Sequence, residues 1–110
     1  MFEFITSLFK PTPVSAETKN EIEKLIESNK VMVFSKTYCP YCTLTKDLLS
    51  SKTKELKVLE LNTLANGKEI QEGLREMTGQ STVPNIFING KHIGGNSDLQ
   101  SLDRSGKLVL

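Results

Sequence analysis

The stretch Lys36–Cys42, which reads KTYCPYC, constrains the fold of this chain more than any other. It follows the apolar run Val31–Phe34 and precedes leucines at helical spacing (Leu44, Leu48 and Leu49). This pattern predicts a buried strand that leads directly into a helix. Pro40 suits the first helical position, because the N–H that it lacks would have no partner there. Cys39 is therefore predicted to be the N-cap of the helix.

The predicted N-cap position gives Cys39 the surroundings of a reactive thiol. A sulfur there faces unpaired backbone N–H groups and the positive end of the helix dipole, and both favour the thiolate. Lys36 adds a positive charge nearby, and cysteines in such electropositive sites are nucleophilic at neutral pH. Cys42 follows at a spacing that places it beside Cys39 on one helical turn, close enough for a disulfide. The pair therefore predicts one thiol that attacks and a neighbour that resolves.

The two cysteines also allow three other interpretations. A structural disulfide would close a very short loop and would constrain the unfolded chain little. A closed zinc site needs four ligands, but the chain offers only 2 cysteines and 1 histidine, His92, which we interpret as structural. The third interpretation is a pair of inert core thiols. A Cys-x-x-Cys motif near a βαβ pattern favours thioredoxin-like redox chemistry over all three.

The elements expected in the first two thirds of the chain alternate between helix and strand, which implies parallel strands. Asn66-Gly67 is expected to form a turn, and Gly79 to end the third helix. That helix should carry Ile70, Leu74 and Met77 on one face. In chain order, the predicted elements are a helix from Ser15 to about Asn29, a strand over 31–35, the cysteine helix to about Ser51, a strand over 57–61 and this third helix.

The last third of the chain breaks the alternation. Two runs, Ile86–Ile88 and Lys91–Ile93, flank Asn89-Gly90, which predicts a hairpin with a type I′ turn. The sheet is therefore expected to be mixed. Good N-cap residues, Asn96–Asp98, then open a last helix.

Length and charge indicate one globular domain. The chain has 110 residues, with 14 Lys and Arg against 13 Asp and Glu, so nothing indicates binding to nucleic acid. No run is long enough to cross a membrane, and two cysteines are too few for a secreted disulfide scaffold. Residues 1–13 are expected to be a flexible N-terminal extension and residues 14–110 the folded domain. The extension matches a mitochondrial leader poorly, because it lacks arginines and contains Glu3.

Three separated motifs carry a resemblance to a known family. The motifs Tyr38–Cys42, Thr82–Pro84 and Gly94–Leu99, in this order, resemble those of dithiol glutaredoxins of the yeast kind, across roughly residues 16–108. The resemblance implies an α/β thioredoxin fold, with a four-stranded mixed sheet and helices on both faces. It implies a glutathione-dependent thiol–disulfide oxidoreductase that reduces protein–glutathione mixed disulfides and protein disulfides. Cys39 is then the nucleophile and Cys42 the resolving thiol.

The same resemblance implies glutathione as co-substrate, no metal, and binding residues for each part of the tripeptide. Seen alone, Gln71 would be a solvated helix residue, Ser97 and Asp98 would be helix caps, and Tyr41 a partly buried aromatic. By resemblance, Lys36 and Gln71 hold the glycine carboxylate, Thr82, Val83 and a cis Pro84 the cysteine part, Ser97 and Asp98 the γ-glutamyl end, and Tyr41 flanks the groove.

The chain departs from its relatives at a few positions. Ser81 stands where many relatives carry arginine, which predicts weaker glutathione binding, and Asn96 stands where some carry a further cysteine. The last helix is expected to be short or frayed, because the chain stops at Leu110. The resemblance further implies protein substrates with disulfides or bound glutathione, reduction of the glutathione pool by glutathione reductase and NADPH, a monomer, and the cytoplasm.

Two alternatives stay open at this point. One is an iron–sulfur carrier, in which a cluster bridges two subunits through Cys39 and two glutathione molecules. Pro40 argues against it, because the cluster carriers in this family usually have glycine or serine there. The other is a thioredoxin driven by its own reductase, although no tryptophan precedes Cys39.

Overall fold

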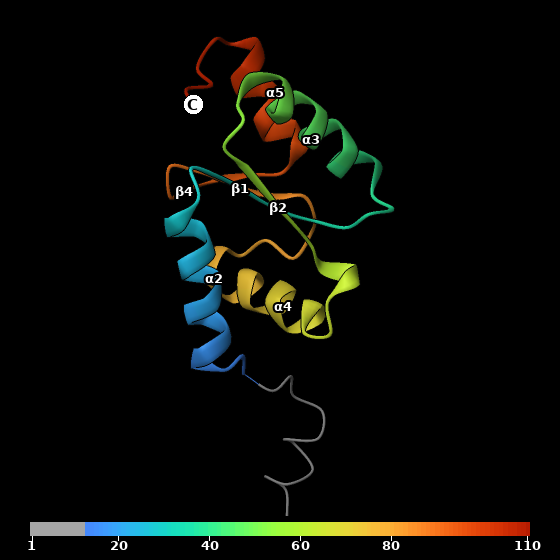
Figure 1. Ribbon diagram of the computed structural model, residues 1–110, viewed down its shortest axis with the longest axis vertical. Coiled ribbons are helices and arrows are strands. Elements are labelled where there is room, and N and C mark those ends of the chain that lie inside the picture. The colour runs from blue at the N-terminus through green and yellow to red at the C-terminus, as the bar shows by residue number, and fades with distance from the viewer. Residues whose placement is uncertain (1–12) are drawn as a thin grey trace, which may run out of the picture.

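A computed structural model describes residues 13–110 as a single sheet with helices packed on it (Figure 1). The predicted extension thus lies outside the described residues except for Pro13, and its boundary stays a prediction. In chain order the elements are α2 (Ala16–Ser28), β1 (Val31–Ser35), α3 (Pro40–Lys52), β2 (Leu56–Glu60), the 3₁₀ helix η1 (Leu61–Thr63), α4 (Gly67–Thr78), β3 (Asn85–Ile88), β4 (Lys91–Gly94) and α5 (Asn96–Arg104).

The sheet is mixed, as predicted, with the strand order β2-β1-β3-β4. The central strand β1 runs parallel to β2, with Val31 opposite Leu56, and antiparallel to β3, with Val31 opposite Ile88. A tight turn joins β3 to β4, with φ of 51° at Asn89 and 79° at Gly90. Positive φ at both central residues is the signature of a type I′ turn, so the predicted hairpin is confirmed.

Helices cover both faces of the sheet (Figure 1): α2 and α4 lie on one side, and α3 and α5 on the other. All of β1 is buried, and its side chains alternate between the two layers. Met32 and Phe34 join the core cluster under α2 and α4, whereas Val31 and Val33 join the cluster under α3 and α5. This double burial explains why β1 reads as an uninterrupted apolar run.

The structure differs from the local expectations at three places in the middle of the chain. The second strand begins and ends one residue earlier than predicted, and it stops at Glu60 because Leu61 already belongs to η1. Asn66 lies in a turn, as predicted, but Gly67 already begins α4 and is buried, where a Cβ atom would lie 1.8 Å from the carbonyl oxygen of Leu61. Met77 is 36% exposed, because α4 packs through Ile70, Gly73 and Leu74 instead. Gly79 ends α4 in the left-handed conformation, as predicted.

The end of the chain also differs from expectation. The N-cap of α5 is Gly95, and Asp98 lies one turn inside the helix, where its carboxylate accepts a hydrogen bond from Gly95 N at 3.0 Å. The last helix is short, but the chain after it is not loose. Leu108 and Leu110 pack against the core cluster beneath α3 and α5.

Candidate active site

Cys39 occupies the N-cap position of α3, as the sequence predicts. Its φ and ψ are −88° and 115°, Pro40 is the first helical residue, and Cys39 Sγ accepts a hydrogen bond from Cys42 N at 3.2 Å. The sulfur therefore meets an unpaired helical N–H, which stabilises a negative charge on it. Both cysteines are free thiols, with Cys39 partly exposed and Cys42 fully buried.

Burial makes the two thiols unequal. It raises the pKa of the Cys42 thiol, and the hydrogen bond to the Cys39 side chain raises it further, although hydrogen bonds to Lys36 and Ser35 lower it. A raised pKa keeps Cys42 protonated while the more accessible Cys39 meets the solvent. The geometry thus supports Cys39 as the attacking thiol.

Asn62 fastens the loop that leads into Cys39 to η1, the 3₁₀ helix that follows β2. The Asn62 side chain accepts a hydrogen bond from Thr37 N at 3.0 Å and donates one to Thr37 Oγ1 at 2.7 Å. Sequence reasoning missed this residue. The signal was available, because Asn62 and Thr37 follow strands that run parallel, so both lie at the same edge of the sheet.

The segment before β3 brings a second strip of backbone to the nucleophile. The Val83–Pro84 peptide bond is cis, as the resemblance implied, and the Val83 carbonyl oxygen lies 3.7 Å from Cys39 Sγ. The Gln80 side chain holds this segment by donating to the carbonyl oxygens of Thr82 at 3.1 Å and Pro84 at 2.9 Å. Gln80 therefore fixes the backbone of the segment that contains the predicted residues Thr82, Val83 and Pro84.

Two hollows flank the nucleophile, and together they take in most of the predicted binding residues. The first, about 440 Å³, includes Lys36 and Gln71 in its lining. The second, about 410 Å³, is lined by residues that include the predicted set Tyr41, Thr82, Val83, Pro84 and Ser97. Asp98 is placed beside this second hollow through its hydrogen bond to Gly95, one of the lining residues. The structure thus divides most of the predicted residues between two hollows, one lined by Tyr38, the residue before Cys39, and the other by Val83, whose carbonyl oxygen lies beside Cys39 Sγ.

Gln71 and His92 both form hydrogen bonds within the protein. Gln71 Nε2 donates to the carbonyl oxygen of Ser81 at 2.7 Å, which ties α4 to the segment before Thr82. His92 Nε2 lies 2.8 Å from Asn85 Oδ1, and its ring is tilted against Phe87 at a centroid distance of 5.1 Å. Burial lowers the pKa of His92, which favours the neutral ring. These contacts support a structural role for His92.

A second link missed by sequence reasoning connects the cysteine helix to α5. The hydroxyl of the fully buried Thr45 donates to Asn96 Oδ1 at 3.0 Å, and Gln100 Nε2 donates to the same oxygen at 3.2 Å. Asn96 also lines the second hollow. Its side chain therefore positions the start of α5, and with it Ser97 and Asp98, relative to α3.

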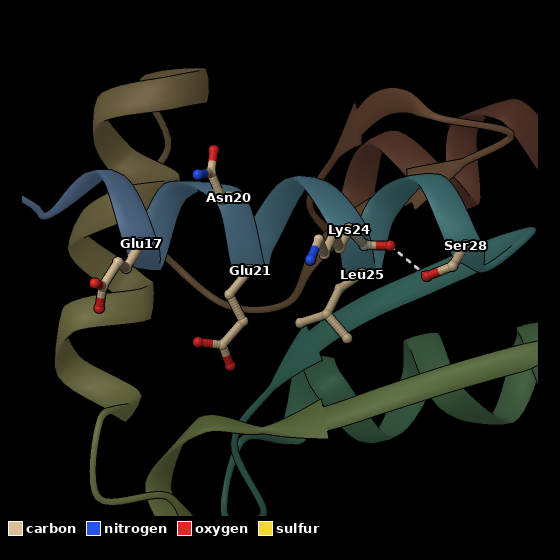
Figure 2. Close-up of a pocket in the computed structure, with 6 residues that line it drawn as sticks. All are labelled: Glu17, Asn20, Glu21, Lys24, Leu25 and Ser28. Atoms are coloured by element: carbon tan, nitrogen blue, oxygen red, sulfur yellow. Dashed lines mark hydrogen bonds between the residues drawn. The ribbon is translucent and has the colours of Figure 1, made fainter.

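Another surface hollow, about 450 Å³, runs along α2 and is unrelated to the cysteines. Figure 2 shows that its lining side chains, among them Glu17, Glu21 and Lys24, come from that one helix. Within residues 13–110, no group of three or more His, Cys, Asp or Glu side chains is placed to hold a metal ion. None of the helices in this part of the chain combines the length and apolar character that a bilayer crossing requires.

A four-stranded mixed sheet with a reactive dithiol at the start of α3 and a cis proline beside it defines the class of thioredoxin-like thiol–disulfide oxidoreductases. Comparison with known proteins narrows this class. A model of the glutaredoxin family matches residues 31–93. The chain is 50% identical to Glutaredoxin-1 of Saccharomyces cerevisiae over 99 residues, which cover 86% of this chain and 90% of the yeast protein.

Plant proteins agree with this match. Glutaredoxin of Ricinus communis is 54% identical over 87 residues, covering 79% of this chain and 85% of the plant protein. The crystal structure of a buckwheat glutaredoxin–glutathione complex superposes with a TM-score of 0.81 at 42% identity, covering 84% of each chain. The chain belongs to the glutaredoxin family. It is therefore an enzyme of that class, a glutathione-dependent oxidoreductase.

Proposed function

We propose that this protein reduces protein–glutathione mixed disulfides and protein disulfides, with Cys39 as nucleophile and Cys42 as resolving thiol. The observation that supports this division of labour is the contrast between the thiols. Cys39 is accessible at a helix N-terminus, whereas Cys42 is fully buried and its pKa is raised. A thiolate is the attacking species in disulfide exchange, so the accessible N-cap thiol starts the reaction.

Reduction of a glutathionylated protein needs only Cys39. Its thiolate attacks the glutathione sulfur of the mixed disulfide, the S–S bond breaks, and the protein leaves as a thiolate that takes up a proton. Cys39 now carries glutathione as a new mixed disulfide. The thiolate of a second glutathione attacks the sulfur of the bound glutathione, which releases glutathione disulfide and restores the Cys39 thiolate. In the net reaction, the mixed disulfide and one free glutathione become the protein thiol and glutathione disulfide, so one disulfide bond breaks and one forms.

Reduction of a protein disulfide needs both thiols. Cys39 attacks one sulfur and forms a mixed disulfide with the substrate, while the other substrate sulfur leaves as a thiolate. Cys42 then loses its proton and attacks Cys39 Sγ, which releases the substrate and leaves an internal disulfide. The 3.2 Å hydrogen bond from Cys42 N to Cys39 Sγ shows that the start of the helix already holds these residues close together. Glutathione then reduces the internal disulfide.

Glutathione recognition is proposed to use the two hollows beside Cys39. Lys36 and Gln71 in the first suit the glycine carboxylate, and the backbone of Val83 is placed to pair with the cysteine part like an added strand. Ser97, Asp98 and the first N–H groups of α5 suit the γ-glutamyl end, because amides bind its carboxylate and Asp98 its ammonium. The similarity to the buckwheat glutaredoxin–glutathione complex supports this ligand.

The test is an activity assay on a protein–glutathione mixed disulfide with two electron sources in parallel. Glutathione with glutathione reductase and NADPH should support turnover, and thioredoxin reductase with NADPH should not. Turnover with thioredoxin reductase alone would instead assign the protein to the thioredoxin-type alternative.

The iron–sulfur carrier remains the second candidate, but no specific observation on the described site favours it. It predicts a coloured protein with visible absorbance after anaerobic purification, and a dimer held by the cluster. We propose instead a colourless monomer, which size-exclusion chromatography and an absorbance spectrum would check. The cytoplasmic address is likewise a proposal, to be tested by fractionation.

A further inference from the structure

The first hollow beside Cys39 carries more positive charge than the proposed glutathione contacts use. Two lysines, Lys36 and Lys68, line it together with Gln71, and no aspartate or glutamate of the described residues is among its lining. We propose that Lys68 is a second cation for the glycine carboxylate of glutathione and a specificity residue for it. This inference rests on the proposed function and adds a residue to it.

The helix geometry places Lys68 beside the proposed subsite. Lys68 precedes Gln71 by three residues on α4, and residues at that spacing lie on the same face of a helix. Both line the same hollow as Lys36, which follows β1. The two lysines thus line one hollow from different parts of the chain, which suits a carboxylate that accepts from several donors.

The acidic side chains of α4 are engaged elsewhere. Glu69 accepts a hydrogen bond from the Ser15 hydroxyl at 3.2 Å, and Glu72 pairs with Arg75. Glu76 pairs with Lys19 at 2.9 Å. Within residues 13–110, neither Lys36 nor Lys68 forms an ion pair, whereas Lys19, Lys30, Lys46 and Lys52 each do. The hollow therefore holds two uncompensated positive charges, and an anionic ligand would relieve their repulsion.

The expected effect is modest and specific, because Lys68 is exposed. Exposed ion pairs are weak, so Lys68→Ala should raise the KM for glutathione about two- to fivefold. It should leave the melting temperature and the alkylation rate of Cys39 unchanged. Added salt should shrink the effect, since exposed charges are screened. Lys68→Arg should keep the wild-type KM within error.

The decisive experiment uses a glutathione analogue without the charge in question. Steady-state kinetics are measured with glutathione and with its monoethyl ester at the glycine carboxyl, for the wild-type protein, Lys68→Ala and Lys57→Ala. Lys57 is an exposed lysine on β2 that does not line the hollow, and it serves as the matched control. Lys68→Ala should raise the KM for glutathione only, and Lys57→Ala should change neither KM.

Two results would overturn the inference. One is an unchanged KM for glutathione in Lys68→Ala, and the other is an equal rise for glutathione and the ester. Either would leave the proposed function standing, provided that the wild-type protein turns over with glutathione. A wild-type protein that does not use glutathione at all would remove both.

Discussion

The carbonyl oxygen of Val83 lies 3.7 Å from Sγ of Cys39, although 44 positions separate the two residues in the chain. The side chain of Gln80 fastens the segment on both sides of Val83 by donating to the carbonyl oxygens of Thr82 and Pro84. The Val83 backbone therefore forms part of the surroundings of the Cys39 thiol.

Replacing each cysteine should separate the two activities. Cys39→Ser should abolish all turnover, because no other described nucleophile adjoins Val83. Cys42→Ser should keep most of the reduction of mixed disulfides, which needs one thiol, and lose most of the reduction of protein disulfides. The measurement is a pair of NADPH-coupled assays, one for each substrate. Loss of both activities in Cys42→Ser with survival in Cys39→Ser would reverse the assigned roles.

Cys42 should react slowly and only at high pH. Burial raises the pKa of its thiol, so the folded state binds its proton more tightly than the unfolded state does. In Cys39→Ser, alkylation of Cys42 by iodoacetamide should need a higher pH in the folded protein than in urea. By linkage, the contribution of this thiol to stability is complete below the unfolded pKa and is lost as the pH rises above it. Equal alkylation profiles in both states would show that burial does not control Cys42.

Asp98 has two candidate roles, which two substitutions can separate. Its carboxylate accepts a hydrogen bond from Gly95 N at 3.0 Å, and we propose that it also binds the ammonium of glutathione. Asp98→Ala removes both contacts and should raise the KM for glutathione about three- to thirtyfold. Asp98→Asn can still accept from Gly95 N but lacks the charge, so it should also raise this KM.

Cysteamine is the control for these variants, since it is a thiol without either end of glutathione. Its reaction should be insensitive to both substitutions at Asp98. Equal losses for glutathione and cysteamine would mean that Asp98 only caps its helix.

Gly67→Ala should lower the stability of the fold, although the residues on either side of Gly67 are exposed. The new Cβ would lie 1.8 Å from the carbonyl oxygen of Leu61, so α4 or η1 must shift. Overpacking of this kind costs about 1–3 kcal/mol. The comparison variant is Gly79→Ala, where a φ of 82° disfavours alanine but no atom lies within 4 Å of the new Cβ.

Urea unfolding would measure both glycine variants, with stability compared at equal slopes. Because α4 also carries Gln71, Gly67→Ala should raise the KM for glutathione, and Gly79→Ala should not. A Gly67→Ala protein with wild-type stability and KM would show that η1 and α4 yield without cost.

Local sequence was enough to predict the parts of this protein that depend on local backbone preferences. The apolar run of β1 followed by Cys39 and Pro40 indicated the strand, the N-cap and the first helical residue. Asn89-Gly90 indicated the hairpin, because both residues tolerate positive φ. The motifs around Cys39, Pro84 and Asp98 carried the family resemblance, which the comparisons confirmed.

Other features came only from how distant segments pack. The contacts of Asn62 with Thr37 and of Asn96 with Thr45 join residues 25 and 51 positions apart. The parallel strands indicate that Asn62 and Thr37 lie at one sheet edge, but only the packed structure shows that the two residues form hydrogen bonds. Local sequence also places Gly67 in a turn, because it does not reveal the Leu61 backbone that packs against this glycine at the start of α4. The unequal burial of Cys39 and Cys42 also depends on the complete core. The spacing of the thiols is written in the sequence, but their accessibility follows from the packing of α3 on the sheet.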